Sequence, residues 1–265
     1  MTKTRLDVFL VEQGYVSCRE QARGRIMAGE VLVDGIKADK AGFPVRDDAQ
    51  IELLGDALPF VSRGGLKLQK ALDVFPINLG GRVAVDIGAS TGGFTDCMLQ
   101  HGASKVYAVD VGYGQLDWKL RSDERVVVME RSNARFMEPA WFTGGKPSFA
   151  TIDVSFISLG LILPPLLSCL TSDGEVIALI KPQFEAGRSE VGKHGVVRDE
   201  LVHSRVCAKI VDLAYSLGYA ARGLDYSPIT GPKGNIEFLL WLGLGKASQM
   251  TAIDIPSIVH KAHEK

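Results

Sequence analysis

The sequence has few cysteines, and none of them lie close together. The four cysteines stand at positions 18, 97, 169 and 207, so the chain has no Cys-x-x-Cys pair. Closely spaced cysteines are the usual signature of a zinc site, and a dense set of cysteines is typical of small secreted proteins held by disulfides. The pattern therefore indicates neither a disulfide scaffold nor a zinc site, and we expect no metal.

The sequence also lacks an apolar run long enough for a transmembrane helix. The longest run, SFISLGLILPPLLSCL at 155–170, is interrupted by Pro164 and Pro165. It is shorter than the ~18–20 residues that a membrane span needs. The first residues, MTKTRLDVFLVEQGY, have neither the apolar core nor the cleavage site of a signal peptide. We therefore expect a soluble, cytoplasmic protein that uses no membrane, with a buried amphipathic helix at 155–170.

The chain carries almost no net charge. Its 30 lysines and arginines balance 31 aspartates and glutamates, which gives a formal net charge of −1. A protein that binds nucleic acid by bulk attraction is usually strongly basic, so any nucleic-acid surface here must be confined to one face. The 265 residues, of which 46% are hydrophobic, suffice for one large domain or for two.

Residues 1–56 predict a small α+β module. Leu6, Phe9 and Leu10 fall on one face of a first helix, and a second helix follows. VLVDG at 31–35 then predicts a short strand that enters an Asp-Gly hairpin turn, and VRDDAQIELL at 45–54 predicts the returning strand. Two short helices and a small sheet would form a compact domain.

This pattern, RLDVFLVEQGYVSCREQARGRIMAGEVLVDG followed by VRDDAQI, resembles the S4 RNA-binding domain. The resemblance implies that basic side chains of the module face RNA phosphates, without reading base sequence. The candidates are Arg5, Arg19, Arg23, Arg25 and Lys37. Arg63, at the end of a predicted linker at 57–65, is a further candidate. The alternative is an ordinary solvated charged face.

Residues 66–245 alternate strands and helices, which predicts a doubly wound, Rossmann-like α/β sheet. The predicted strands are RVAVDI at 82–87, KVYAVD at 105–110, RVVVME at 125–130, SFATIDV at 148–154 and EVIALIK at 175–181. YAARGLDYSPITGPKGNIEFLLWLGL at 219–244 predicts an antiparallel closing hairpin. A sheet that closes in this way resembles the S-adenosylmethionine (SAM) methyltransferase fold. In the tail at 246–265, the stretch IPSIVHKAHEK predicts a short helix.

The stretch VAVDIGASTGGF leads a predicted strand into a glycine-rich turn and then into a helix. Open α/β sheets bind ligands at this edge, beyond the carboxyl ends of the strands. Gly88 permits the tight turn, Gly92 and Gly93 allow a ligand close to the backbone, and Asp110 can accept ribose hydroxyls. A dinucleotide such as NAD would use the same features, and each residue alone could be an ordinary turn or cap.

Two details favour SAM over NAD. Asp86 directly precedes the loop, and Asn133 follows the third strand, where the resemblance to methyltransferases implies an adenine contact. The candidate cofactor-binding residues are Asp86, Gly88, Ser90, Gly92, Gly93, Phe94, Asp110, Asn133 and Asp153.

The residues after the fourth strand indicate which atom receives the methyl group. Base-amine methyltransferases carry an (Asp/Asn)-Pro-Pro-aromatic motif there, whereas this chain has DVSF at 153–156. Enzymes that methylate carbon through a covalent adduct need a nearby cysteine, and Cys169 lies in the apolar run instead. Oxygen is therefore the remaining candidate for the acceptor atom. A hydroxyl acceptor must lose its proton as the methyl group arrives.

Two lysines and two carboxylates, Lys67, Asp153, Lys181 and Glu237, form a candidate catalytic set. With DIGASTGGF, the set resembles that of the FtsJ-like ribose 2′-O-methyltransferases. The chain also has the S4-like module and the motifs SRGGLKL, DVSFISL and KPQFEAGR. With these features, it resembles the TlyA family. Members of that family are often labelled hemolysins and are characterised as ribosomal RNA cytidine-2′-O-methyltransferases. The resemblance implies that Lys181 is the base, Lys67 its cationic neighbour, and the carboxylates orienting groups. Whether Lys181 takes the proton or only positions the hydroxyl stays open.

The polar, glycine-punctuated stretch at 183–200 predicts a mobile loop whose Arg188, Lys193 and Arg198 grip RNA phosphates. A plain surface loop is the alternative. Two other functions stay open: an RNA-binding ribosome assembly factor with a vestigial methyltransferase domain, and a membrane-active hemolysin.

Overall fold

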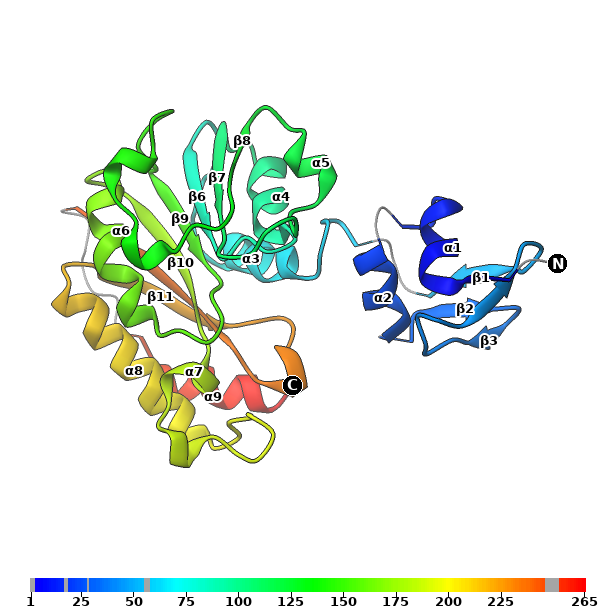
Figure 1. Cartoon of the computed structure of the whole chain (residues 1–265). Coiled ribbons are helices and arrows are strands. Elements are labelled where there is room, and N and C mark those ends of the chain that lie inside the picture. The colour runs from blue at the N-terminus through cyan, green and yellow to red at the C-terminus, as the bar shows by residue number, and fades with distance from the viewer. Residues whose placement is uncertain (1–2, 17–18, 28, 55–57, 246–252) are drawn as a thin grey trace. The chain divides into compact units, whose positions relative to one another are not determined.

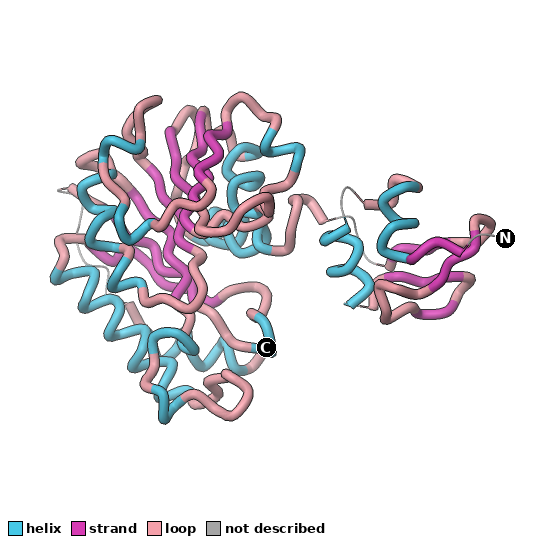
Figure 2. The backbone as a smooth tube through the Cα atoms, in the orientation of Figure 1, coloured by secondary structure: helices cyan, strands magenta, loops and turns pink. Residues whose placement is uncertain are grey.

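The computed structural model describes residues 3–16, 19–27, 29–54, 58–245 and 253–265 (Figures 1 and 2). The chain divides into two compact units, Met1–Ser62 and Arg63–Lys265. Residues 55–57, where the predicted linker begins, and residues 246–252 of the predicted tail lie outside the described residues. No helix formed by the described residues is long and apolar enough to cross a membrane.

The first unit is the predicted α+β module. Its elements are β1 (Lys3–Arg5), α1 (Leu6–Glu12), α2 (Arg19–Met27), β2 (Val31–Val33), β3 (Ile36–Lys37), β4 (Pro44–Arg46) and β5 (Ile51–Leu53). The strands form a sheet in the order β3-β2-β5 and an antiparallel pair β1-β4. The single returning strand predicted over 45–54 is wrong, because a turn at 47–48 divides it between β4 and β5. The core contains Leu6, Phe9 and Leu10, as predicted.

The second unit is built on a seven-stranded sheet. Its strands are β6 (Val83–Ile87), β7 (Lys105–Val109), β8 (Val126–Met129), β9 (Phe149–Ile152), β10 (Glu175–Ile180), β11 (Ala220–Tyr226) and β12 (Phe238–Gly243). They follow the order β11-β12-β10-β9-β6-β7-β8, in which β12 is antiparallel to both of its neighbours. The pairs from β10 to β8 are all parallel. The doubly wound sheet with an antiparallel closing hairpin is therefore confirmed.

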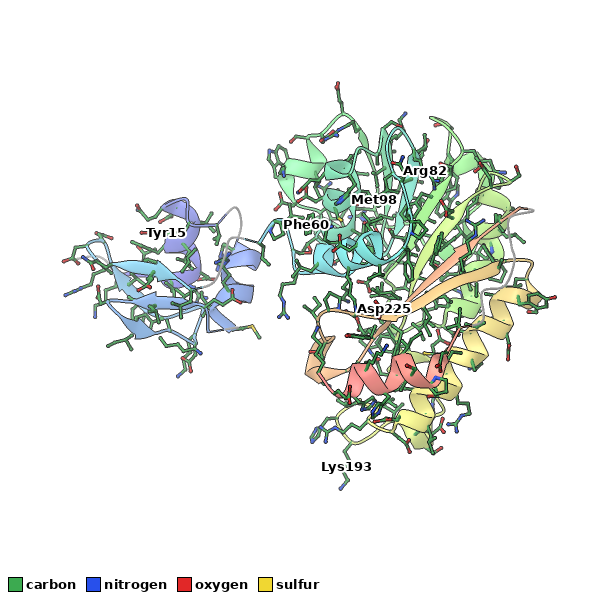
Figure 3. All side chains as sticks on the ribbon, turned by 180° about the vertical axis from the view of Figure 1, so that it is seen from behind. Tyr15, Phe60, Arg82, Met98, Lys193 and Asp225 are labelled. Atoms are coloured by element: carbon green, nitrogen blue, oxygen red, sulfur yellow. The ribbon has the colours of Figure 1, made fainter. Side chains whose placement is uncertain are left out.

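Helices cover both faces of this sheet (Figure 1). The helices are α3 (Gly64–Val74), α4 (Gly93–Gln100), α5 (Trp118–Arg121), α6 (Leu163–Cys169), α7 (Pro182–Glu185), α8 (Glu200–Ser216) and α9 (Ile255–His263). α6, α8 and α9 pack on one face over a continuous apolar core, and α3 and α4 lie on the other. Met98 of α4 is fully buried (Figure 3).

The apolar run at 155–170 differs from the single helix predicted for it. Residues 155–158 are a loop, Leu159–Leu161 is a 3-10 turn, and only Leu163–Cys169 is α-helical. The proline pair lies in the first turn of α6, where a missing N–H costs no helical hydrogen bond. The prolines therefore mark the beginning of the helix.

The topology gathers loops at one edge of the sheet. The carboxyl ends of the parallel strands β6, β7, β9 and β10 all lie there, and Asp153 and Lys181 directly follow two of them. Because β12 is antiparallel to β10, with Phe238 opposite Ile180, the residue before β12 also reaches this edge. That residue is Glu237, so the fold brings it beside Lys181.

Candidate active site

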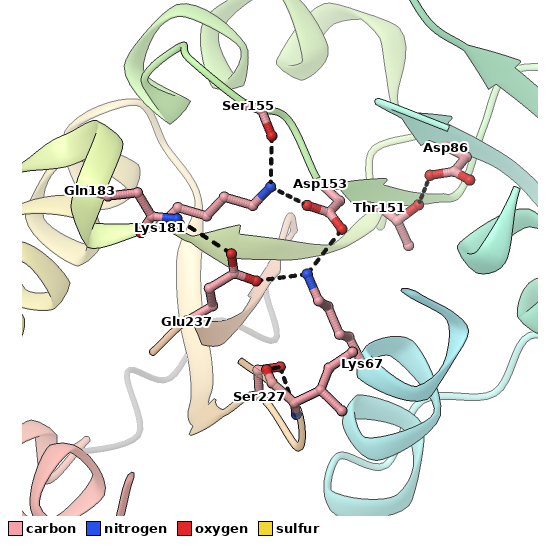
Figure 4. Close-up of polar contacts among 10 residues, drawn as sticks. Lys67, Asp86, Thr151, Asp153, Ser155, Lys181, Gln183, Ser227 and Glu237 are labelled. Atoms are coloured by element: carbon pink, nitrogen blue, oxygen red, sulfur yellow. Dashed lines mark hydrogen bonds and ion pairs between the residues drawn. The ribbon is translucent and has the colours of Figure 1, made fainter. Parts of the chain in front are cut away.

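The four residues of the candidate catalytic set meet at this edge (Figure 4). The Lys67 Nζ donates to Glu237 Oε2 at 2.7 Å and to Asp153 Oδ2 at 3.4 Å. The Lys181 Nζ lies 2.5 Å from Asp153 Oδ1. The side chains thus form a row of alternating charge, Glu237–Lys67–Asp153–Lys181. Lys67, Lys181 and Glu237 are buried, and Asp153 is partly exposed.

Local backbone features position the two ends of this row. Lys181 has extended backbone angles and precedes Pro182, which begins α7, so its side chain leaves the sheet edge instead of continuing a strand. Glu237 packs against Gly231, where an added Cβ would lie 2.3 Å from Glu237 Oε1. Only a residue without a side chain leaves the Glu237 carboxylate in this place.

The charges of the row stabilise one another. Burial lowers the pKa of Lys67, but attraction by Asp153 and Glu237 outweighs it, so the Lys67 pKa is raised above its ordinary value. Burial raises the pKa of Asp153, but Lys67 and Lys181 outweigh it, so the Asp153 pKa is lowered. Lys67 is therefore a permanent cation and Asp153 a permanent anion at neutral pH.

Two polar neighbours of the row were not among the residues predicted from the sequence. Ser155 Oγ accepts a hydrogen bond from Lys181 Nζ at 3.2 Å, and Gln183 Nε2 donates to Glu237 Oε1 at 3.4 Å (Figure 4). Both stand in motifs that the sequence analysis quoted, DVSF and KPQF, two residues beyond Asp153 and Lys181 respectively. That proximity to predicted site residues was the available signal.

A cleft of about 560 Å³ adjoins the row and shares Asp153 with it. This volume lies within the range of small-molecule and cofactor sites. Five of the predicted cofactor residues line the cleft: Gly88, Ser90, Asp110, Asn133 and Asp153. Gly88 has φ +85°, and a Cβ there would lie 2.5 Å from the Asp153 carbonyl oxygen. The close approach of the two strand ends therefore requires glycine at 88.

Asp110 presents a fixed carboxylate to the cleft. Its Oδ2 accepts from the Ser90 N–H at 2.8 Å, and its Oδ1 accepts from the Gly112 N–H at 2.7 Å. Each carboxylate oxygen has a second lone pair, so both can still accept a ribose hydroxyl. Asn133 uses its Oδ1 to cap the following turn, accepting from the Arg135 N–H at 3.1 Å. The residues present fit an adenosine-containing cofactor.

The other four predicted cofactor residues, Asp86, Gly92, Gly93 and Phe94, do not line the cleft. Asp86 is fully buried and accepts hydrogen bonds from the Thr95 hydroxyl at 2.7 Å and the Thr151 hydroxyl at 2.9 Å. Burial raises the pKa of Asp86 to about 6. Gly92 has φ +97° and precedes α4, packed against Leu120. These four residues instead shape the glycine-rich loop beneath the cleft.

In the first unit, three predicted RNA-facing arginines share one buried carboxylate. Asp7 accepts from Arg5 Nε at 3.0 Å, Arg19 Nη2 at 2.8 Å and Arg23 Nε at 3.3 Å. The hydrogen bond from Arg5 contributes most to a strongly lowered Asp7 pKa, so Asp7 is ionised. The arginines are half-exposed, and Arg19 and Arg23 line a shallow hollow with Met27. Two positive charges remain on this face after pairing.

The remaining basic candidates lie in different environments. Arg25 is only 7% exposed, so its side chain does not face solvent, and its prediction as an RNA contact is corrected. Arg63, Arg188, Lys193 and Lys37 are exposed, and Figure 3 shows Lys193 projecting from the surface.

The loop at 183–200 also differs from the prediction. Its second half is held to the protein, with Val196 and Val197 buried and Asn235 Oδ1 accepting from the Val197 N–H at 3.2 Å. The Asn235 side-chain amide also donates to the Gly195 carbonyl at 3.0 Å. In this loop, which was predicted to be mobile, the segment at 195–197 is therefore held in place by Asn235, two residues before Glu237.

Comparison with known families gives two matches in chain order. Residues 4–51 match the S4 domain, and residues 60–244 match the FtsJ-like methyltransferases. The second match covers most of the chain, including the cleft and all four residues of the charged row.

Individual proteins agree over nearly the whole chain. The chain is 53% identical to YqxC of Bacillus subtilis (strain 168), provisionally named an rRNA methyltransferase, over 99% of this chain and 95% of that protein. It is 42% identical to the 16S/23S rRNA (cytidine-2′-O)-methyltransferase TlyA of Mycobacterium tuberculosis (strain CDC 1551 / Oshkosh), over 98% of this chain and 97% of that protein.

Solved structures agree as well. A structure from Streptococcus thermophilus, provisionally named a hemolysin, is 50% identical with a TM-score of 0.81, covering all of this chain and 97% of that one. A Listeria monocytogenes structure, provisionally named a SAM-dependent methyltransferase, is 15% identical with a TM-score of 0.52, covering 69% of this chain and 98% of that one, and shares the fold alone.

Proposed function

Since the chain belongs to the FtsJ-like methyltransferase family, we propose that it transfers a methyl group from SAM to the 2′-hydroxyl of a cytidine ribose in ribosomal RNA. The observation that carries the proposal is the Glu237–Lys67–Asp153–Lys181 row beside a cleft that fits the cofactor. The names of the B. subtilis and M. tuberculosis relatives support ribosomal RNA as substrate, and the latter supports the cytidine 2′-oxygen.

The cofactor would occupy the cleft beyond the carboxyl ends of β6, β7 and β9. Asp110 would accept its ribose hydroxyls, Asn133 would lie at its adenine, and the backbone at Gly88 would approach it closely. When bound, SAM supplies an electrophilic methyl group on a positively charged sulfur. Asp153 lines the cleft and belongs to the row, so the acceptor hydroxyl would meet the methyl group at this residue.

The two lysines are suited to different tasks. Lys67 is held between two carboxylates, and its raised pKa keeps it charged, so it cannot accept a proton. Lys181 has one carboxylate partner, Asp153, whose charge it shares with Lys67. Lys67 pairs with two carboxylates and Lys181 with one, so we assign Lys181, in its neutral form, as the base that takes the hydroxyl proton. Lys67 and Glu237 then hold Asp153 and the hydroxyl in line for transfer. Such alignment can supply ~7–11 kcal/mol of the barrier.

RNA binding is assigned to the first unit and to exposed cations of the second. The half-exposed Arg5, Arg19 and Arg23 present fixed guanidinium groups that suit phosphate oxygens. Arg63, Arg188 and Lys193 are proposed as additional phosphate contacts. None of these contacts reads a base edge, so the choice of nucleotide must come from the shape of the RNA and from the cleft.

The test incubates the protein with labelled SAM and ribosomal subunits from a strain that lacks it, and then maps 2′-O-methyl groups. Lys181→Ala should abolish labelling and leave SAM binding intact. Lys181→Arg separates the two roles of this residue, because arginine keeps the positive charge but cannot act as a base at neutral pH. We expect Lys181→Arg to be inactive as well.

Three outcomes would contradict parts of this proposal. Full activity of Lys181→Ala would refute the assignment of the catalytic site. Substantial activity of Lys181→Arg would refute the assignment of Lys181 as the base. Methyl groups mapped to bases instead of 2′-oxygens would refute the acceptor.

A further inference from the structure

A buried carboxylate outside the charged row, Glu185, binds the loop that follows β9. Glu185 is 6% exposed. Its Oε2 accepts from the Ser158 hydroxyl and its Oε1 from the Leu159 N–H, both at 2.7 Å. No ion pair to Glu185 is formed by the residues that the structure describes. The side chain therefore acts through two short hydrogen bonds to one loop.

These bonds join the two segments that carry Asp153 and Lys181. Glu185 ends α7, which begins directly after Lys181, and Ser158 ends the loop that begins at Asp153. The paired register of β9 and β10 stops at Ile152, so sheet hydrogen bonds do not hold the two segments together beyond it. The tie by Glu185 spans that gap.

The other polar contacts between these segments, among the described residues, are made by Lys181, a residue of the charged row. Lys181 Nζ bonds both Asp153 and Ser155, and the Phe184 ring lies 5.0 Å from the ring of Phe156. When Lys181 contacts the acceptor hydroxyl, it must give up part of its hydrogen bonding to Asp153 and Ser155. The contact between Lys181 and the loop is then weaker. The Glu185 tie is independent of Lys181 and persists through that exchange.

The loop also contains a strained residue that needs such support. Phe156 has φ +64° although it is not glycine, and its side chain is almost fully exposed. A residue in this backbone region keeps its conformation only where the surrounding structure holds it. The Ser158 and Leu159 bonds fasten the chain two and three residues after Phe156.

We propose that Glu185 is a positioning residue for methyl transfer: it fastens the loop at 153–159 to α7, so that Asp153 and Ser155 keep their places when Lys181 engages the acceptor hydroxyl. This inference rests on the proposed function.

The test compares Glu185→Ala with Glu185→Gln in the full chain. Alanine removes both bonds. Glutamine keeps them, because its carbonyl can accept from the Leu159 N–H and its amide can donate to the Ser158 oxygen. We expect kcat for Glu185→Ala to fall on the order of 10- to 100-fold, since small misplacements at a reacting centre are this costly. KM for RNA should stay unchanged, and Glu185→Gln should restore kcat. Ser158→Ala removes one of the two bonds to Glu185, together with the hydrogen bond that the Ser158 Oγ accepts from the Gly160 N–H at 3.1 Å, and its kcat should lie between.

A second measurement needs no RNA. Hydrogen exchange of the amides at 155–161 should be faster in Glu185→Ala than in the wild type and normal in Glu185→Gln. Wild-type kcat in Glu185→Ala, or equal losses in the alanine and glutamine variants, would overturn the inference. If Glu185→Ala does not fold, Ser158→Ala gives the same comparison. Failure of the wild type to methylate RNA would instead overturn the proposed function. Unchanged hydrogen exchange in Glu185→Ala would show that Glu185 does not hold the loop at 153–159.

Discussion

Asp86 shows how one buried side chain links the cofactor loop to the pH dependence of stability. It is fully buried, and burial raises its pKa to about 6. Between about pH 4 and 6 the unfolded chain has lost this proton while the folded protein keeps it, so the Asp86 contribution to stability falls as the pH rises. The shift corresponds to about 3 kcal/mol. We expect Asp86→Asn to remove this fall, so that the variant gains stability relative to the wild type as the pH rises from 4 to 7.

Urea unfolding of both proteins at several pH values measures this difference. The difference isolates Asp86 from Asp153, whose lowered pKa acts in the opposite direction and is common to both proteins. Thr95 and Thr151 can each bond the asparagine amide, so the loop should keep its conformation. A stability difference that does not change with pH would contradict the assignment.

At the residue scale, two members of the charged row were predicted because they lie at the ends of predicted strands. Asp153 and Lys181 are fixed there by the rule that parallel strands share an edge. Lys67, ahead of the predicted sheet, and Glu237, at the start of the final predicted strand, were candidates by residue type, and the family resemblance implied the roles of all four residues. Glu185 was not predicted, because its partners depend on how the loop at 153–159 folds back.

At the scale of elements, the turn that leads into β12 decides where Glu237 lies. Gly231 has ordinary backbone angles, so alanine there is strained only by contact, with its Cβ 2.3 Å from Glu237 Oε1. We expect Gly231→Ala to displace the Glu237 carboxylate from Lys67 and to lower kcat on the order of 100-fold. SAM binding, measured by titration, should persist because neither residue lines the cleft.

A matched control for this change is Gly187→Ala. It adds the same methyl group, at a position where the nearest atom is the end of a flexible side chain, Glu190, at 3.3 Å. Its activity should match the wild type. Equal activity of Gly231→Ala and Gly187→Ala would show that the position of Glu237 does not limit transfer.

Element boundaries were less predictable than element types. The parallel strands have strong apolar patterns and were found where predicted, within one or two residues at each end. The prediction failed at 45–54, where Asp47 and Asp48 form a turn, and at 155–170, where apolar residues continue through a loop. In both places long-range contacts, not local periodicity, decide the backbone: β5 pairs with β2, and Ser158 is bonded by Glu185.

At the scale of the whole molecule, a nearly neutral protein must bind a polyanion through a local surface. The chain as a whole carries a formal charge of −1, yet the first unit concentrates three arginines on one carboxylate. Asp7 fixes the guanidinium groups without cancelling them. This arrangement favours RNA phosphates at one face and gives no general attraction for nucleic acid.

The double variant Arg19→Gln/Arg23→Gln tests this local surface. It removes two of the three charges and leaves Asp7 paired with Arg5. RNA affinity should fall by a similar factor for different RNA sequences, and the slope of log K against log salt should decrease by roughly 1.4 to 1.8, because about 0.7 to 0.9 counterions are released per phosphate contact. SAM affinity should be unchanged.

Arg46→Gln is the matched control for this double variant. Arg46 is equally half-exposed in the same unit but pairs with Asp34 and Asp48. We expect its RNA affinity and salt slope to match the wild type. If Arg46→Gln reduces the salt slope as much per charge removed, RNA binding reflects the total charge of the unit, and the Asp7-centred face has no special role.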